Sequence, residues 1–175
     1  MKKRIFWAII FAVSFVSVHA QFVLTPSDGL VYAQGVYTIN RQATIEQNLQ
    51  AASNAIKWVI PDAVIEQDPQ NSNTLFASAK AVIKMGKSGA MSLNHKGTYT
   101  LGIEASTEGI TIRFVRLSQF EHEQGSIIAP WKPDEKTIIN YFVFKYDGKV
   151  RHKKAKLAIE NWANDLVQEI TKSIQ

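Results

Sequence analysis

The chain has 175 residues, enough for one domain, and is 46% hydrophobic and 20% charged. These fractions are close to those of an average globular protein and argue against a disordered chain. The absence of cysteine excludes disulfides, thiol catalysis and cysteine metal sites. The net charge of +5 falls to +2 for residues 21–175, which hold 17 basic and 15 acidic residues. We therefore expect no nucleic-acid partner.

Residues 1–20 have the pattern of a secretory signal peptide. A basic start at residues 2–4 precedes an apolar run at 5–18, and Val18-His19-Ala20 fits a small-x-small cleavage site. We predict cleavage between Ala20 and Gln21, and hence an exported protein, periplasmic or secreted; an uncleaved anchor is the alternative. The apolar run is shorter than the ~20 residues that a membrane helix needs. We expect no integral membrane segment in residues 21–175, which we predict to form a single domain.

Residues 21–61 predict two extended segments followed by a helix. A short strand at 22–24 and a turn at 26–29 lead into an extended segment at 30–39, which is rich in β-branched and aromatic residues. Thr44 and Gln47 have the spacing of a capping box, and Pro61 ends the helix. Its predicted apolar face consists of Ile45, Leu49, Ala52, Ile56 and Val59. We expect Trp58, near the helix end, to fill part of the core.

Residues 74–117 predict an antiparallel meander. After a short strand at 63–67 and a turn at 68–73, three runs alternate apolar and polar residues, with breaks at 86–89 and 107–109. A period of two places the apolar set on the core side of each strand and the polar set in water. The apolar set is Leu75, Ala77, Ala79, Ala81, Ile83 and Met85, then Tyr99, Leu101, Ile103 and Ala105, then Ile110, Ile112 and Phe114.

The last third of the chain predicts an irregular excursion, one strand and a long helix. Gly125, Pro130 and Pro133 interrupt residues 121–135, whereas 138–146 has a strand composition. Residues 149–154 are basic and are expected to form a solvated turn before the helix; a role at an anionic surface is the alternative. The apolar face of this helix is predicted to be Ile159, Ala163, Leu166, Ile170 and Ile174, with Trp162 beside it.

This order predicts an α+β fold: a two-layer domain with a curved antiparallel sheet and two helices on one face. Some segments also resemble a family of exported bacterial proteins of unknown function with a TATA-binding-protein-like (TBP-like) fold. The resemblance covers about residues 30–117, and it brings no established activity with it. It is carried by Gly35–Ile39, Ala43-Thr44, Ile56–Trp58, Val64–Asp68, Leu75–Ala77, Tyr99–Leu101 and Gly109–Phe114.

The TBP-like resemblance does not predict DNA binding. TBP bends DNA with apolar wedges inserted at base steps. Phe76 is the single aromatic residue among the outward positions of the meander, which are otherwise small, polar or charged. These other positions are Ser78, Lys80, Val82, Lys84, Thr98, Thr100, Glu104, Thr111 and Arg113.

Few residues suggest a reaction centre. Gly86-Lys87-Ser88 lacks the earlier glycine of a phosphate loop, and no serine lies in a nucleophile-elbow motif. In an extended run Glu121 and Glu123 would share one side, roughly 6.5–7 Å apart, with His122 pointing away. We interpret them as a solvated strand end; a paired-carboxylate site is the alternative.

Trp131, between Pro130 and Pro133, is the candidate ligand-binding residue, because an aromatic side chain on a stiff loop makes a good contact. It could equally fold back over the sheet edge. We predict no catalytic residue, metal or cofactor. The first functional hypothesis is a non-enzymatic binding or interaction module of the cell envelope that binds an unidentified protein or small ligand. The alternatives are a hydrolase with a dispersed site near Glu121 and Glu123, and a structural subunit of an envelope assembly.

Overall fold

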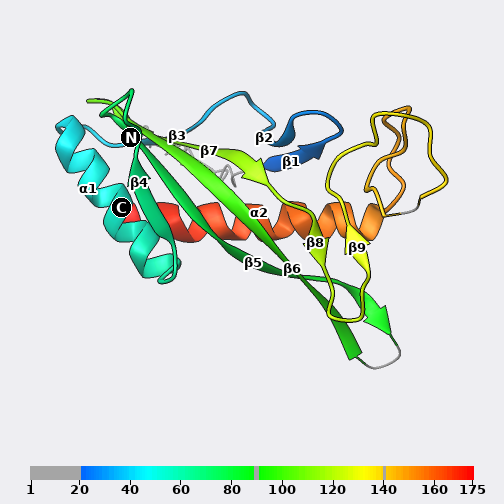
Figure 1. Cartoon of the computed structure of the whole chain (residues 1–175). Helices are drawn as coiled ribbons and strands as arrows, with labels where there is room; N and C mark the ends of the chain where they lie inside the picture. Colours follow the sequence, from blue (N-terminus) through cyan, green and yellow to red (C-terminus); the bar gives the residue numbers. More distant parts are fainter. Residues whose placement is uncertain (1–20, 89–90, 140) are drawn as a thin grey trace, which may run out of the picture.

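The computed structural model describes residues 21–88, 91–139 and 141–175. The predicted signal peptide at 1–20 lies outside these residues, as does part of the predicted break at 86–89. Figure 1 shows a long, twisted sheet with two helices and a small separate hairpin beside it. In chain order the elements are β1 (Phe22–Thr25), β2 (Gly29–Tyr32), β3 (Tyr37–Asn40), α1 (Ile45–Val59), β4 (Val64–Gln67), β5 (Thr74–Ser88), β6 (Met91–Ala105), β7 (Gly109–Leu117), β8 (Phe120–Glu121), β9 (Ile127–Ile128) and α2 (Lys153–Ile174).

Among the described residues the main sheet is antiparallel, in the order β3-β7-β6-β5-β4. The hairpin of β5 and β6 is its backbone, with a register that runs from Thr74 opposite Glu104 to Ser88 opposite Met91. This confirms the predicted meander, but both strands extend further than the sequence pattern indicated. Gly86 lies within β5 rather than in a turn: it has a φ of 118° at a bulge between Lys84 and Lys87.

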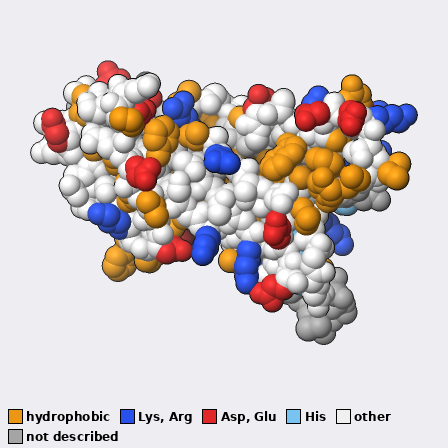
Figure 2. Space-filling view, viewed as in Figure 1, with side chains coloured by type: hydrophobic (Ala, Val, Ile, Leu, Met, Phe, Trp, Pro, Cys, Tyr) orange, Lys and Arg blue, Asp and Glu red, His pale blue; other side chains and the backbone are white. Residues whose placement is uncertain are grey.

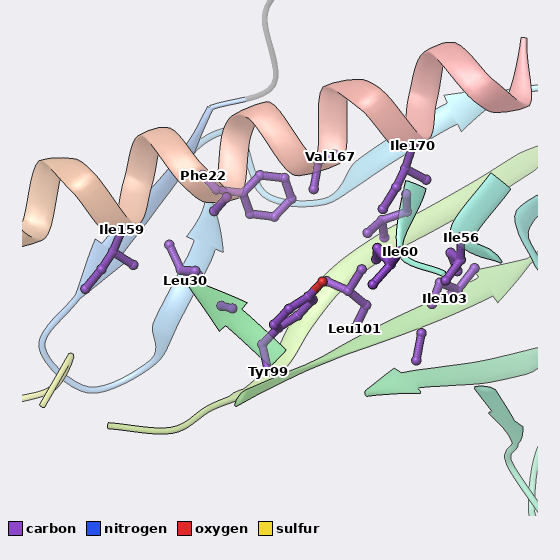
Figure 3. Close-up of a cluster of buried hydrophobic side chains, with 14 of the residues drawn as sticks. Phe22, Leu30, Ile56, Ile60, Tyr99, Leu101, Ile103, Ile159, Val167 and Ile170 are labelled. Atoms are coloured by element: carbon purple, nitrogen blue, oxygen red, sulfur yellow. The ribbon is translucent and has the colours of Figure 1, made fainter. Parts of the chain in front are cut away.

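The alternating apolar residues of the meander form the core, as predicted. Leu101, Ile103 and Ile110 are fully buried, whereas outward-facing residues of the meander such as Ser78 and Lys80 are exposed. Figure 3 shows side chains of β1, β2, β6 and both helices meeting in this core. Because the sheet has one apolar face, α1 and α2 must cover that face to remove it from water.

The second helix also holds the N-terminal hairpin in place. The side chain of Asn164 accepts a hydrogen bond from the Phe22 backbone N–H at 2.6 Å and donates one to the Phe22 carbonyl at 3.1 Å. Glu160 accepts from the Leu24 N–H at 2.8 Å. The β1–β2 hairpin therefore belongs to the helical layer, whereas β3 pairs with β7. The predicted single extended segment at 30–39 is wrong for this reason: Gly35, with a φ of 103°, turns the chain from one sheet to the other.

Helix α1 begins as predicted, with Thr44 and Gln47 forming a capping box. Trp58, however, is 81% exposed, so the expectation that it fills the core is wrong. At about 100° per residue, Trp58 lies on the far side of the helix from the buried Ile56. The sequence analysis missed two buried positions of this helix, Ala55 and the polar residue Asn48, which is fully buried.

The predicted strand at 138–146 is also wrong. This segment makes two isolated bridges, Phe142 with Ala129 and Phe144 with Val150. The Val143 carbonyl accepts hydrogen bonds from the backbone N–H groups of both Arg151 and His152, at 2.8 and 3.1 Å. The chain therefore curls around Val143 instead of joining the sheet.

Replacement of Asn48 by alanine should lower the free energy of unfolding by about 2–3 kcal/mol, because the buried Asn48 amide makes three hydrogen bonds that alanine cannot make. The Asn48 amide donates to the carbonyls of Arg41 at 3.2 Å and Ser106 at 2.7 Å, and its oxygen accepts from the Arg41 guanidinium at 2.6 Å. Asn54→Ala, an exposed position of the same helix, is the matched control and should change stability by less than about 0.5 kcal/mol. Urea denaturation measures both, and equal effects would contradict this role for Asn48.

Candidate functional site

The two predicted carboxylates, Glu121 and Glu123, lie at the end of the sheet where β8 and β9 form a small hairpin. Phe120 is opposite Ile128 and Glu121 is opposite Ile127, and β8 pairs with β6 through Lys96 and Glu121. Phe120 is fully buried against Gly97, where a Cβ atom would come within 2.6 Å of its ring. Only glycine at position 97 lets this hairpin close onto β6 without displacing Phe120.

The two predicted carboxylates do not form a pair on one strand face. The extended run ends at Glu121, because a turn begins at His122, whose N–H donates to the Ser126 carbonyl at 2.8 Å. Glu121 accepts a hydrogen bond from the Gln119 side chain at 2.7 Å, and Glu123 forms an ion pair with Lys96 at 2.6 Å. The hydrogen bond and charge of Lys96 lower the pKa of Glu123. A carboxyl group with a lowered pKa is ionised at neutral pH and is a poor general acid.

The structure places two histidines together, a contact that the sequence analysis missed. The rings of His95 and His122 lie 5.4 Å apart, on the neighbouring strand β6 and in the turn after β8. His95 is only 3% exposed, and its Nε2 is 3.0 Å from the Ser126 hydroxyl. Burial lowers the pKa of His95. Among the described residues no three His, Cys, Asp or Glu side chains are arranged to hold a metal ion.

Trp131 lies in a different environment, a loop whose described residues are 130–139 and 141–146 and which we call the apolar loop. Its base is fixed, because Ala129 accepts from the Val143 N–H at 2.8 Å and donates to the Tyr141 carbonyl at 2.9 Å. Pro130, Pro133 and Val143 are buried. The indole of Trp131 remains 38% exposed, so it does not fold back completely over the sheet edge.

The apolar loop concentrates exposed hydrophobic side chains. Of the ten large exposed hydrophobic residues in the described parts of the chain, four belong to it: Trp131, Ile138, Ile139 and Tyr146. Ile138 is 95% exposed. Figure 2 shows hydrophobic side chains gathering at the end of the molecule that carries β8, β9 and the loops after them. Contiguous exposed apolar surface of this kind marks interaction sites in folded proteins.

The open face of the sheet offers a different, polar surface. The hydroxyl groups of Ser78 and Thr100 are 2.9 Å apart, and those of Thr38 and Thr111 are 3.3 Å apart, so part of this face is already internally hydrogen-bonded. The apolar loop is therefore the stronger candidate contact surface.

Acidification should destabilise the protein through His95. Burial lowers the pKa of His95 in the folded state. As the pH falls, His95 is therefore protonated in the unfolded chain before it is protonated in the folded chain. The contribution of neutral His95 is thus fully present above the unfolded pKa of about 6.5 and is lost as the pH falls towards the folded pKa. Urea midpoints measured from pH 7.5 to pH 5 should fall more steeply for the unmodified chain than for His95→Gln. Parallel curves for the two proteins would contradict this prediction.

Replacement of both Glu121 and Glu123 by glutamine should leave the free energy of unfolding nearly unchanged. Both side chains are exposed, and exposed ion pairs contribute little. Urea denaturation of the double variant against the unmodified chain measures this change. A much larger loss of stability would show that the two carboxylates have a structural role.

Comparison with known proteins identifies the fold but no activity. No family model matches the sequence, and no curated protein matches it. The structure is similar to the crystal structure of a DUF4468 family protein from Bacteroides ovatus ATCC 8483, with a TM-score of 0.57 and 11% sequence identity over 79% of this chain and 85% of that chain. At this identity the likeness shows a shared fold alone. That protein belongs to a family of unknown function, so the comparison brings no activity to this chain.

Proposed function

We propose that this chain is an exported, non-enzymatic binding module of the cell envelope whose contact surface is the apolar loop. The observation that carries the proposal is the exposure of Trp131, Ile138, Ile139 and Tyr146 in one short loop with a fixed base. A preorganised surface loses little conformational freedom when it binds a partner. Aromatic side chains in such positions supply much of the binding energy at interfaces.

Export and fold type are parts of the same proposal. The basic and apolar pattern of residues 1–20, followed by Ala20-Gln21, supports secretion with cleavage at that bond. Gln21 directly precedes β1, so cleavage there would leave the folded domain intact. From β3 to α2 the order is a strand, a helix, the strands β4 to β9 and a second helix, which supports a TBP-like arrangement. Within the described residues, no helix is sufficiently long and apolar to cross a membrane.

A photo-crosslinking amino acid placed at position 138 should give covalent adducts in cells that export the protein. The same amino acid at position 58 is the matched control, because Trp58 is also highly exposed but lies on α1, at the other end of the molecule (Figure 1). Adducts from position 138 alone would support the proposal, whereas equal adduct yields or none would overturn it. Mass spectrometry of the recovered protein should also show Gln21 as its first residue.

Catalysis would contradict the non-enzymatic part of this proposal. The purified protein should not hydrolyse a panel of ester, peptide and glycoside substrates. Hydrolysis that disappears in the Glu121→Gln, Glu123→Gln double variant, with stability retained, would establish the hydrolase alternative instead.

A further inference from the structure

We infer that the apolar loop docks onto the surface of an anionic lipid bilayer. This inference rests on the proposed function, because it names the partner of the same surface. Three independent features carry it: the way Ile138 projects, the charge of the loop and of the segment that follows it, and the rigidity of the loop.

The side chain of Ile138 projects from the loop instead of lining a concave surface. At 95% exposure, Ile138 has almost no protein neighbour of its own. A projecting aliphatic side chain can enter the acyl boundary of a bilayer, whereas a rigid protein partner would need a matching hollow. Trp131 and Tyr146 flank it in the loop, and Trp and Tyr are the residues that favour the membrane–water interface.

The positive charge of residues 21–175 is concentrated in this loop and in the segment that follows it. Residues 130–154 hold seven basic and three acidic side chains, a net charge of +4. The rest of residues 21–175 holds ten basic and twelve acidic side chains, a net charge of −2. The six lysines of this segment are all at least partly exposed: Lys132, Lys136, Lys145, Lys149, Lys153 and Lys154. A lysine-rich segment that carries exposed apolar side chains is complementary to an anionic bilayer, which attracts each nearby lysine.

One hollow within the loop has the chemistry to receive a phosphodiester headgroup. It has a volume of about 390 Å³, and Lys136, Lys145 and Arg151 line it together with Thr137, Tyr146 and Asp147. Asp147 forms an ion pair with Lys149 at 3.3 Å, so its carboxylate is partly compensated within the protein. Because the Arg151 guanidinium already donates to the Ile139 carbonyl, Lys136 and Lys145 are the cations that would pair with a phosphate group there.

The loop is already held in its docking shape. The Arg151 guanidinium donates to the Ile139 carbonyl, and the Lys132 ammonium lies 5.9 Å from the centre of the Tyr146 ring. The rings of Tyr141 and Phe142 stack at 4.3 Å. The Arg151 contact joins the segment after the loop to Ile139, and the Lys132–Tyr146 contact joins the two ends of the loop. Insertion into a bilayer therefore requires little additional ordering.

Vesicle flotation tests this inference with the protein lacking residues 1–20. It should bind vesicles that contain phosphatidylglycerol and should not bind vesicles of phosphatidylcholine alone. Binding should weaken as the salt concentration rises from about 0.1 M to about 0.5 M, because salt screens the lysines. Fluorescence of Trp131 should shift to shorter wavelength on binding, and this shift should be absent in Trp131→Phe.

Variants locate the binding surface. Ile138→Asp should weaken vesicle binding at least about tenfold, and Lys136→Gln with Lys145→Gln should also weaken it by about tenfold or more. Trp58→Asp changes an exposed hydrophobic residue and the net charge in the same way as Ile138→Asp, but at the far end of the molecule, and should stay within about twofold of the unmodified protein. Thermal melts should show that all variants remain folded.

Several results would overturn the inference: no vesicle binding, equal binding to both kinds of vesicle, or unchanged binding of Ile138→Asp. The crosslinking experiment separates this failure from that of the proposed function. Protein adducts at position 138 without vesicle binding would support the proposed binding function and contradict the inferred bilayer partner. If position 138 gives no adducts and no vesicles bind, both would be overturned.

Discussion

The structure depends on covering the apolar face of one long antiparallel sheet. Leu101 and Ile103 of β6 and Ile112 of β7 are almost completely buried because α1 and α2 pack across this face. Each such side chain contributes roughly 1.5–3 kcal/mol by leaving water. The alternation of apolar and polar residues also sets the strand register, since a shift by one residue would turn the apolar set outward.

Helix α2 connects the sheet to the parts that lie outside it. Its Asn164 and Glu160 side chains hydrogen-bond to the backbone of β1, and Trp162 contacts Tyr99 of β6 with ring centres 4.9 Å apart. Its first turn begins at Lys153, separated from the end of the apolar loop by residues 147–152, so the same helix helps to fix where that loop emerges. The proposed contact surface therefore lies close in the chain to a helix whose Ile159, Ala163 and Val167 are buried, which favours a rigid surface over a mobile one.

The three-dimensional structure changes the interpretation of residues 138–146. As a sequence, residues 138–146 look like a strand because they are rich in Ile, Tyr, Phe and Val. In the structure Val143 and Phe144 turn inward, whereas Ile138, Ile139 and Tyr146 remain exposed. Propensity measures how well a residue fits a half-buried surface, so it cannot distinguish a strand from a loop that is fixed on one side and open on the other.

The sequence by itself determined the meander, the capping box of α1, both amphipathic helices and the α+β class, because these depend on local periodicity and spacing. Only the tertiary structure decided that Asn48 is buried, that Trp58 is exposed, and that His95 meets His122. These outcomes depend on which helix face meets the sheet and on how β8 pairs with β6, contacts between residues far apart in the chain. No local sequence pattern predicts these outcomes, because they are fixed by the packing of the whole domain.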